Sequence, residues 1–485
     1  MPMNILYLLS GLPLASGALF FTFNNLKVKY RLSIFTAGTH LIITYLLFAG
    51  FIAPPQNAWF NFDSLTKLFL MILSNVFFWV TANSYKYIKH SPIEKIEKSR
   101  QIFYNMTNLY LFANTLALIS NHLGLYWVAL ESTTLCVAPL IYFYRDKESL
   151  EAMWKYLFLV SVGLAFAFIG ILFLTLSAHG TEFMDNALYI TVLVSGASKL
   201  NLIWLKAGFI FIFVGLSAKI GIAPIHPGEV DAVSNSPSPV AALISASLGG
   251  TALMGVLRIL QILSWTSLLQ FAQILLIIGG TVSLAVALIF MFRVTNYKRM
   301  IAYSSVEHMG IVLIGFGIGG IALTGALLHL IFNSLNKTAF FFMAGNIHRN
   351  YKSREIGRIY SLLNNLRWTG ILFLISFLAV IAMPPFGLFF SELMLLQGLI
   401  ANNQFVLMTF IIILLLFIFI GMSRNVFRML YRTTDKSTRT FNEHFEFSHL
   451  SAIVLLCILA GLGIFIPEPL AKIISDVTRL FVHGI

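Results

Sequence analysis

Apolar stretches of about 20 residues recur along the whole chain, and they constrain its fold more than any motif does. A helix needs about 20 apolar residues to cross a membrane, and inside lipid only helices and closed barrels satisfy every backbone polar group. We count about fourteen such stretches. They are residues 3–23, 32–53, 64–84, 102–120, 122–144, 154–177, 207–233, 238–261, 267–292, 300–318, 321–347, 368–400, 404–427 and 447–467. The sequence therefore predicts an all-α polytopic membrane protein with about fourteen transmembrane helices.

Composition agrees, because 58% of the residues are hydrophobic and only 11% are charged, more apolar than a soluble chain. A net charge of +13 is also typical of nucleic-acid-binding proteins, but most of the 32 Lys and Arg residues cluster in alternate loops between the apolar stretches. Cytoplasmic loops carry such positive charge, so we expect no nucleic acid and predict both termini outside a bacterial or archaeal cytoplasmic membrane. The basic loops are residues 27–31, 86–100, 145–147, 293–299, 349–367 and 424–439.

Two of the expected spans are interrupted by proline and also carry a charge. Lys219 precedes Pro224 and Pro227 in the seventh span, and in the twelfth the proline pair 384–385 precedes Glu392. Irregular backbone at membrane depth is tolerated only where it is buried in protein or lines a cavity, so these breaks favour an ion path over a lysine that merely reaches toward the interface. Interrupted spans five helices apart indicate two inverted five-helix repeats.

These counts predict one transmembrane domain over residues 1–485. Helices 1–3 occupy residues 1–100, the first repeat (helices 4–8) residues 101–262, the second repeat (helices 9–13) residues 263–432, and helix 14 with its tail residues 433–485. The stretch 182–205 is punctuated by Ser, Asn and Lys and is expected to be a surface helix.

Ionisable residues inside the apolar stretches form a set that suits proton transfer. An acid and a lysine shift each other's proton affinity, and histidine relays protons between its two nitrogens. Packing alternatives are open for single members: Glu131 could pair with a Ser or Thr, and a lone histidine could be a core residue. His226 and Asp231, in the broken seventh span, are either proton-uptake groups or loop caps. The set is Glu131, Lys219, Glu307, His308, His329, Lys337 and Glu392.

Several cofactor motifs can be set aside. Residues 315–320 read GFGIGG, but no strand–helix unit surrounds them, and we expect flexible glycines between helices 10 and 11. A phosphate-binding loop with lysine is not found in the sequence, so drive by ATP is not expected. Haem between His308 and His329 is less consistent with their neighbouring Glu and Lys residues than proton transfer is. No cofactor is expected in this chain.

The motifs together resemble the antiporter-like, proton-conducting membrane subunits of respiratory complex I and its relatives. The matching segments read KRMIAYSSVEHMG, HLIFNSLNKTAFFFMAGNI, PPFGLFFSE and AKIGIAPIH followed by SPSPVAALIS. Within that superfamily, ALESTTLCVAPLIYFYRDKESLEAMWKY and SSVEHMG are most similar to hydrogenase-4 component F.

The resemblance implies a central hydrophilic axis through the fourteen helices. It implies Glu131 and Lys219 as the input pair and His308 or His329 as a bridge. Lys337 and Glu392 would then lie toward the exit, and Lys155, at the start of helix 6, matches another lysine common in the family.

Two departures from the family pattern stand out. Where family members read close to HTWLPDAH after the break in helix 7, this chain reads HPGEVDAV, with Glu229 added and Val233 in place of the second histidine. In helix 11 it has Phe332 and Asn333 where Asn-His is frequent. These changes bear on the efficiency of the relay more than on the fold.

The expected function is proton translocation in a complex I-related assembly of the hydrogenase-4 or formate hydrogenlyase type, with no redox chemistry in this chain. Iron–sulfur and nickel–iron centres are expected only in partner membrane and peripheral subunits, which would couple electron transfer to the movement of protons or Na⁺. The alternatives are a subunit of a multisubunit sodium/proton antiporter, or a membrane subunit of an inorganic-carbon uptake complex.

Overall fold

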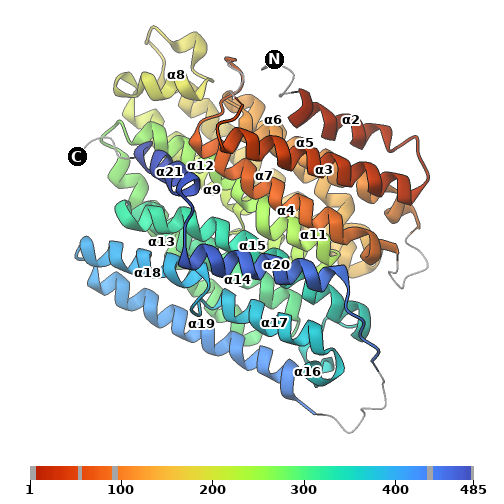
Figure 1. Ribbon diagram of the computed structural model, residues 1–485. Coiled ribbons are helices and arrows are strands. Elements are labelled where there is room, and N and C mark those ends of the chain that lie inside the picture. Colours follow the sequence, from red (N-terminus) through yellow and green to blue (C-terminus); the bar gives the residue numbers. More distant parts are fainter. Residues whose placement is uncertain (1–6, 53–56, 90–96, 434–440, 482–485) are drawn as a thin grey trace.

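The computed structural model describes residues 7–52, 57–89, 97–433 and 441–481. In these residues the chain forms a bundle of helices that run side by side, without an extended strand (Figure 1). The prediction of an all-α membrane protein is confirmed. Expected spans 3–23 and 32–53 and basic loops 86–100 and 424–439 fall partly outside the described residues.

The first half of the chain forms the helices from α2 to α12. They are α2 (Leu12–Leu19), α3 (Leu26–Phe48), α4 (Ser64–Lys89), α5 (Glu97–Ile119), α6 (Leu123–Ile141), α7 (Lys147–Ser177), α8 (Ile190–Ser195), α9 (Leu202–Ile220), α10 (Pro227–Asn235), α11 (Ser238–Leu243) and α12 (Gly249–Leu263). A π-helical turn, Ile244–Leu248, joins α11 to α12.

The second half of the chain forms the helices from α13 to α21. Its helices are α13 (Leu269–Arg293), α14 (Tyr297–Ile318), α15 (Gly320–Tyr351), α16 (Leu362–Asn365), α17 (Arg367–Val380), α18 (Gly387–Ala401), α19 (Phe405–Tyr431), α20 (Phe447–Ile464) and the amphipathic α21 (Glu468–Arg479).

Each expected span coincides with a helix or an interrupted pair of helices in the described residues. By length and composition, 10 of these helices can cross a membrane, and three shorter apolar helices accompany them. The stretch 182–205 forms α8, short 3₁₀ turns and, from Leu202, the first residues of α9, so no helix of spanning length lies wholly within it. The total of fourteen crossings and the inverted repeats stay predictions.

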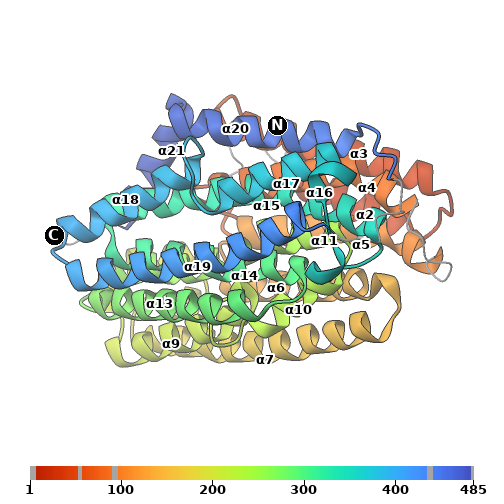
Figure 2. The ribbon, with the colours of Figure 1, turned by 90° about the horizontal axis from the view of Figure 1, so that it is seen from below.

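Helix α15 lies in the middle of the bundle. It contacts α14, α17, α18 and α20, and every residue from 325 to 347 is buried. Figure 2 shows α7 and α9 at one side of the bundle and α20 at the opposite side. The ionisable residues of α14 and α15 are therefore enclosed by protein, whereas α7 and α19 expose large apolar side chains such as Phe158 and Leu416.

Close helix packing in the first half depends on small residues. A Cβ atom on Gly163 of α7 would lie 2.5 Å from the carbonyl oxygen of Gly215 in α9. Glycine at both positions lets the two backbones approach, as is common between membrane helices. This packing holds α9, which carries Lys219, against α7.

The glycine-rich motif lies at the junction of two helices, as expected. Helix α14 ends at Ile318, the end of the expected span 300–318, and Gly319 and Gly320, with φ of 77° and 55°, lead the chain into α15. Among the cations of the basic loops, Lys29 and Lys298 are buried. Each of these two ammonium groups donates to a backbone carbonyl of a neighbouring segment.

Candidate functional site

The first helix break lies where the prolines predict it. Helix α9 ends at Ile220, Gly221 has a φ of 78°, and α10 begins at Pro227 after an irregular stretch. Glycine adopts this left-handed conformation without the steric cost that a Cβ atom brings. The break leaves Lys219 in the last turn of α9, inside the bundle.

The second break has the same form. Helix α17 ends at Val380, Ala382 has a φ of 53°, and α18 begins at Gly387. Glu392 lies in the second turn of α18. Each interrupted helix therefore holds ionisable residues near its break: Lys219 lies before the first break with Glu229 after it, and Glu392 lies after the second.

Lys219 is held by neutral acceptors. Its Nζ donates to the carbonyl oxygen of Leu130 at 2.7 Å and to Oγ1 of Thr134 at 2.6 Å, both on α6. No ion pair joins Lys219 to an acid among the residues described. A buried ammonium group needs such hydrogen bonds, and without a contacting carboxylate its proton is less firmly held.

Glu131 follows Leu130, and only one of its two carboxylate oxygens has a hydrogen-bond partner. Its Oε1 accepts a hydrogen bond from Ser161 of α7 at 2.9 Å, whereas its buried Oε2 has no partner in the described structure. Glu131 and Lys219 lie within range of each other's charge but do not form a contact ion pair. Pairing with a serine thus accounts for one oxygen and leaves the other free for a further hydrogen bond.

Lys337, in the middle of α15, is held in the same manner as Lys219. Its Nζ donates to the carbonyl oxygen of Ile301 at 3.0 Å and to the hydroxyl of Ser304, both on α14. Glu307 of α14 is buried and lies within range of the charge of Lys337. We call Glu131, Lys219, Lys337 and Glu307 the central charge row.

The two buried histidines contact each other. Nδ1 of His308 and Nε2 of His329 are 2.9 Å apart, and Nδ1 of His329 is 2.9 Å from the hydroxyl of Ser391. Candidate ligand atoms of these histidines and of Glu392 all lie within 4.8 Å of one another, so this group could hold a metal ion. At 2.9 Å, however, the two nitrogens share a hydrogen bond, and a metal bound by both would displace that proton. The geometry suits proton sharing better.

Charged side chains of both signs line a cavity of about 560 Å³ that opens at the basic-loop end of α7, α10 and α14. Oδ1 of Asp231 accepts from Arg299 at 2.7 Å, and Oδ2 lies 3.4 Å from Nζ of Lys155, which also pairs with Glu151 at 2.5 Å. Because α7 begins at Lys147, Lys155 lies two turns inside the helix. We call this cavity the vestibule.

Neither His226 nor Asp231 caps a helix in the broken seventh span. His226 occupies the N-cap position of α10, but its side chain makes no capping hydrogen bond. Its ring lies 5.9 Å from that of Phe290 and 6.0 Å from that of Tyr303. The Asp231 carboxylate faces the vestibule through its ion pairs, so it caps no helix either.

Sequence reasoning missed the groups that hold the lysines and several buried polar atoms. The hydroxyls of Thr134, Ser161 and Ser304 gave no signal, because serine and threonine are ordinary residues of membrane helices. Glu229 stood out only as a departure from a family pattern, although it is buried and its Oε2 has no hydrogen-bond partner in the described structure. Tyr156 likewise has a buried hydroxyl without a described partner.

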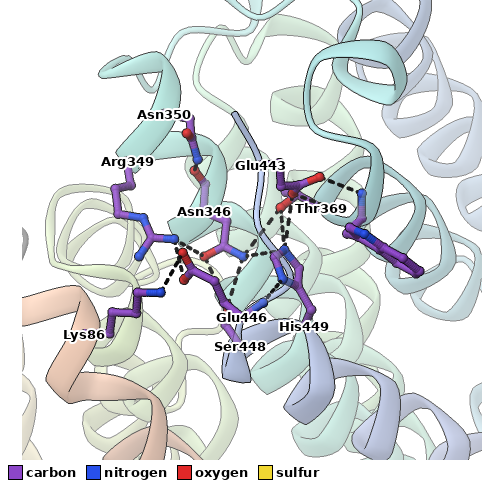
Figure 3. A network of polar contacts seen from close by, with 10 residues as sticks. Lys86, Asn346, Arg349, Asn350, Thr369, Glu443, Glu446, Ser448 and His449 are labelled. Atoms are coloured by element: carbon purple, nitrogen blue, oxygen red, sulfur yellow. Dashed lines mark hydrogen bonds and ion pairs between the residues drawn. The ribbon is translucent and has the colours of Figure 1, made fainter. Parts of the chain in front are cut away.

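A second polar network lies at the basic-loop end of α4, α15, α17 and α20 (Figure 3). Glu446 pairs with Arg349 at 2.7 Å and with Lys86 at 3.0 Å. Glu443 accepts from the backbone N–H groups of Trp368 and Thr369 at 2.7 and 3.0 Å. We call this set the terminal network: Lys86, Asn346, Arg349, Asn350, Trp368, Thr369, Glu443, Glu446, Ser448 and His449.

The two acids of the terminal network lie outside the helices, and their pKa values reflect these contacts. Burial alone would raise the pKa of Glu443, but hydrogen bonds from His449 and Thr369 outweigh it and hold the pKa below its ordinary value. Burial also opposes ionisation of Glu446, and Arg349 and Lys86 bring its pKa below the ordinary value. Both acids are therefore fixed as anions.

Comparison with known proteins places this arrangement in a family. The family described as NADH:quinone oxidoreductase/Mrp antiporter, transmembrane, matches residues 120–418, more than half of the chain. The chain belongs to this family. Every residue of the central charge row lies within the matched segment of this antiporter-like subunit, whereas Lys86, Glu443 and Glu446 of the terminal network lie outside it.

The antiporter-like subunit is similar to subunits of several complexes. It is 33% identical over 403 residues to a hydrogenase-4 component F homolog of Methylacidiphilum infernorum, covering 80% of this chain and 84% of the relative. It is 25% identical to hydrogenase-4 component B of Escherichia coli, covering 73% of this chain and 53% of that relative. These names confirm the resemblance drawn from the motifs and indicate that relatives work within multisubunit assemblies.

Solved structures share the fold. A chain of an archaeal membrane-bound sulfane sulfur reductase superposes with a TM-score of 0.85 at 20% identity, covering 99% of this chain and 98% of that one. A chain of the Mrp complex from Dietzia gives 0.84 at 17% identity, covering 99% and 98%. At such identities the likeness establishes the architecture of the antiporter-like subunit.

Proposed function

We propose that this antiporter-like subunit conducts protons across the membrane within a redox complex of the hydrogenase-4 or formate hydrogenlyase type. The observation that carries the proposal is the central charge row, in which two buried lysines are held by neutral acceptors and Oε2 of Glu131 has no described partner. A lysine in a firm ion pair would keep its proton, whereas one held by carbonyl and hydroxyl oxygens releases and regains it more readily.

Proton uptake begins at the vestibule. It opens among the basic loops, which the positive-inside rule assigns to the cytoplasm, and both termini then lie outside. Asp231 and Lys155 provide exchangeable charges at its floor, with His226 beyond them on the same broken span. Lys219 and Glu131 receive the proton first, and Lys337, Glu307, the histidine pair and Glu392 carry it toward the opposite face.

The driving force comes from partner subunits. Moving one charge against 100 mV requires about 2.3 kcal/mol, and no motif in this chain supplies it. Electron transfer at iron–sulfur and nickel–iron centres of partner subunits would change the field at the central charge row, and the row would respond by moving protons. The exposed apolar faces of α7 and α19 leave room for membrane partners or lipid.

Extraction of the tagged chain from its native membrane in mild detergent tests the proposal. Mass spectrometry should identify a hydrogenase-like large subunit and iron–sulfur proteins that are absent from an untagged control, and the purified material should contain nickel and iron. Recovery of small membrane proteins alone would contradict a redox-driven role.

A sodium/proton antiporter is the second candidate, and the structural likeness to the Mrp complex chain favours it. In vesicles that contain the purified assembly, an imposed Na⁺ gradient would then change the internal pH without any electron donor. A redox-driven subunit should leave the pH unchanged under the same gradient.

A further inference from the structure

Glu229 is an acid inside the bundle that was not counted in the central charge row. It lies in the first turn of α10, directly after the break in the seventh span. Its side chain reaches back to the end of α9, because a Cβ atom on Gly221 would overlap Oε2 of Glu229. The absence of a side chain at Gly221 therefore makes room for this carboxylate two residues beyond Lys219.

The carboxylate of Glu229 lies within range of the charges of both lysines of the row. Lys337 and Lys219 are the cations close enough to act on its charge. Lys219 is in turn within range of Glu131, and Lys337 within range of Glu307. With Glu229 included, acids and lysines alternate from α6 through α9, α10 and α15 to α14.

Hydrogen bonding at this position is incomplete. Oε2 of Glu229, the hydroxyl of Tyr156 and Oε2 of Glu131 are all buried without a partner in the described structure, and Tyr156 lies within range of both acids. Buried polar atoms rarely go unpaired, and water is the partner that several unpaired oxygens can share. Glu131 and Glu229 both also lie within range of the charge of Lys219.

Helix stability alone does not explain a glutamate here. Acids are favourable in the first turn of a helix, and Glu229 meets that condition. However, an acid that served only the helix dipole would gain most by hydrogen bonding to the free N–H groups of the turn or by reaching solvent. Glu229 does neither in the described structure, since it is buried and turned toward α9.

We infer that Glu229 is a proton-carrying residue that joins the Lys219 half of the row to the Lys337 half. Protons pass from Lys219 to the Glu229 carboxylate, by way of water shared with Tyr156, and from Glu229 to Lys337. His308 and His329, one of which was expected to be the bridge, then act after Lys337 in the path. They contact each other and Ser391, and Lys337 is the cation of the row that acts on them. The inference rests on the proposed proton-conducting function.

The test uses the intact complex in vesicles and measures protons moved per electron transferred, with formate or hydrogen as the donor, whichever the complex oxidises. Glu229→Gln keeps the shape and removes the titrating group, and Glu182→Gln is the matched control at an exposed glutamate paired with Lys199. We expect Glu229→Gln to lower the rate of proton movement about tenfold or more while electron transfer continues, and the control to behave as wild type. Glu229→Asp, which keeps the acid, should recover a measurable part.

The Lys219→Ala variant distinguishes failure of the Glu229 bridge from failure of the proposed proton-conducting function. Loss of proton movement in Lys219→Ala with normal movement in Glu229→Gln would overturn the bridge and leave the proposed function standing. Normal movement in Lys219→Ala would overturn the function itself. If Glu229→Gln does not assemble, the Glu229→Asp complex provides the test. Proton movement at the wild-type rate, together with an unchanged carboxylic-acid infrared band on turnover, would overturn the inference.

Discussion

The central charge row and the terminal network contain the same kinds of side chains and differ in how completely these are paired. In the terminal network, Glu446 meets two cations and Glu443 meets two backbone N–H groups and His449. In the row, Lys219 and Lys337 meet only neutral oxygens, and Glu131 keeps one oxygen without a described partner. Full pairing fixes charge and joins helices, whereas partial pairing lets a proton move at small cost.

The terminal network and the central charge row also lie in different parts of the bundle. The terminal network ties the segment before α20 to α4, α15 and α17 at the basic-loop end, and its Lys86 side chain is half exposed. The row crosses the protein interior, where α15 is buried from residue 325 to 347. We therefore expect substitutions in the row to affect transport with little change in stability, and substitutions in the network to do the reverse.

Lys337→Ala should give the largest effect of the set. It removes the cation between Glu307 and the first half of the row, so proton movement per electron should fall about tenfold or more. The matched control is Lys199→Ala, which removes an exposed lysine. Assembly and electron transfer should remain, as checked by blue-native electrophoresis and donor oxidation. A full proton yield in the Lys337→Ala complex would remove this lysine from the path.

Glu443→Gln should lower stability and leave transport intact. Its backbone and His449 partners would lose their charged acceptor, which costs about 1–3 kcal/mol of unfolding free energy. The apparent melting temperature in detergent measures the loss, and Glu182→Gln, at an exposed pair, should change little. Equal melting temperatures for the two variants would show that the terminal network does not stabilise the bundle.

The pH dependence of stability should show a smaller effect. The pKa values of Glu443 and Glu446 are lowered in the folded protein, so the unfolded chain binds more protons between the lowered values and the ordinary value of 4.5. Their stabilisation is complete above pH 4.5 and declines as the pH falls through the lowered values. The melting temperature of a Glu443→Gln, Glu446→Gln double variant should vary less with pH below 4.5 than that of wild type. Parallel curves would count against the assignment.

Ser161→Ala should give the smallest effect. It removes the hydrogen bond to Oε1 of Glu131 but no ionisable group. We expect proton movement to slow about two- to tenfold, in line with one net hydrogen bond of ~0.5–1.5 kcal/mol. Ser132→Ala, one residue from Glu131 with its hydroxyl bonded to its own helix, is the control. A loss as large as that in Lys337→Ala would mean that Ser161 itself carries the proton.

The sequence predicted those parts of the molecule that have a local signature. Proline and glycine beside Lys219 and Glu392 located both helix breaks, and apolar length located the helices. The acceptors of Lys219 lie on α6, about ninety positions away, and depend on how α9 rotates against its neighbours, which no local pattern specifies. Glu443 lies in a polar segment that reads as a linker, although folding brings it to α17 and His449.

The ratio of protons moved to electrons transferred, in vesicles that carry the Lys219→Ala or the Glu131→Gln complex, tests the central claim most directly. The account predicts a lower ratio in both variants, with donor oxidation and subunit composition as in wild type and with Glu182→Gln unaffected. A wild-type ratio in both variants would contradict a proton path through the central charge row.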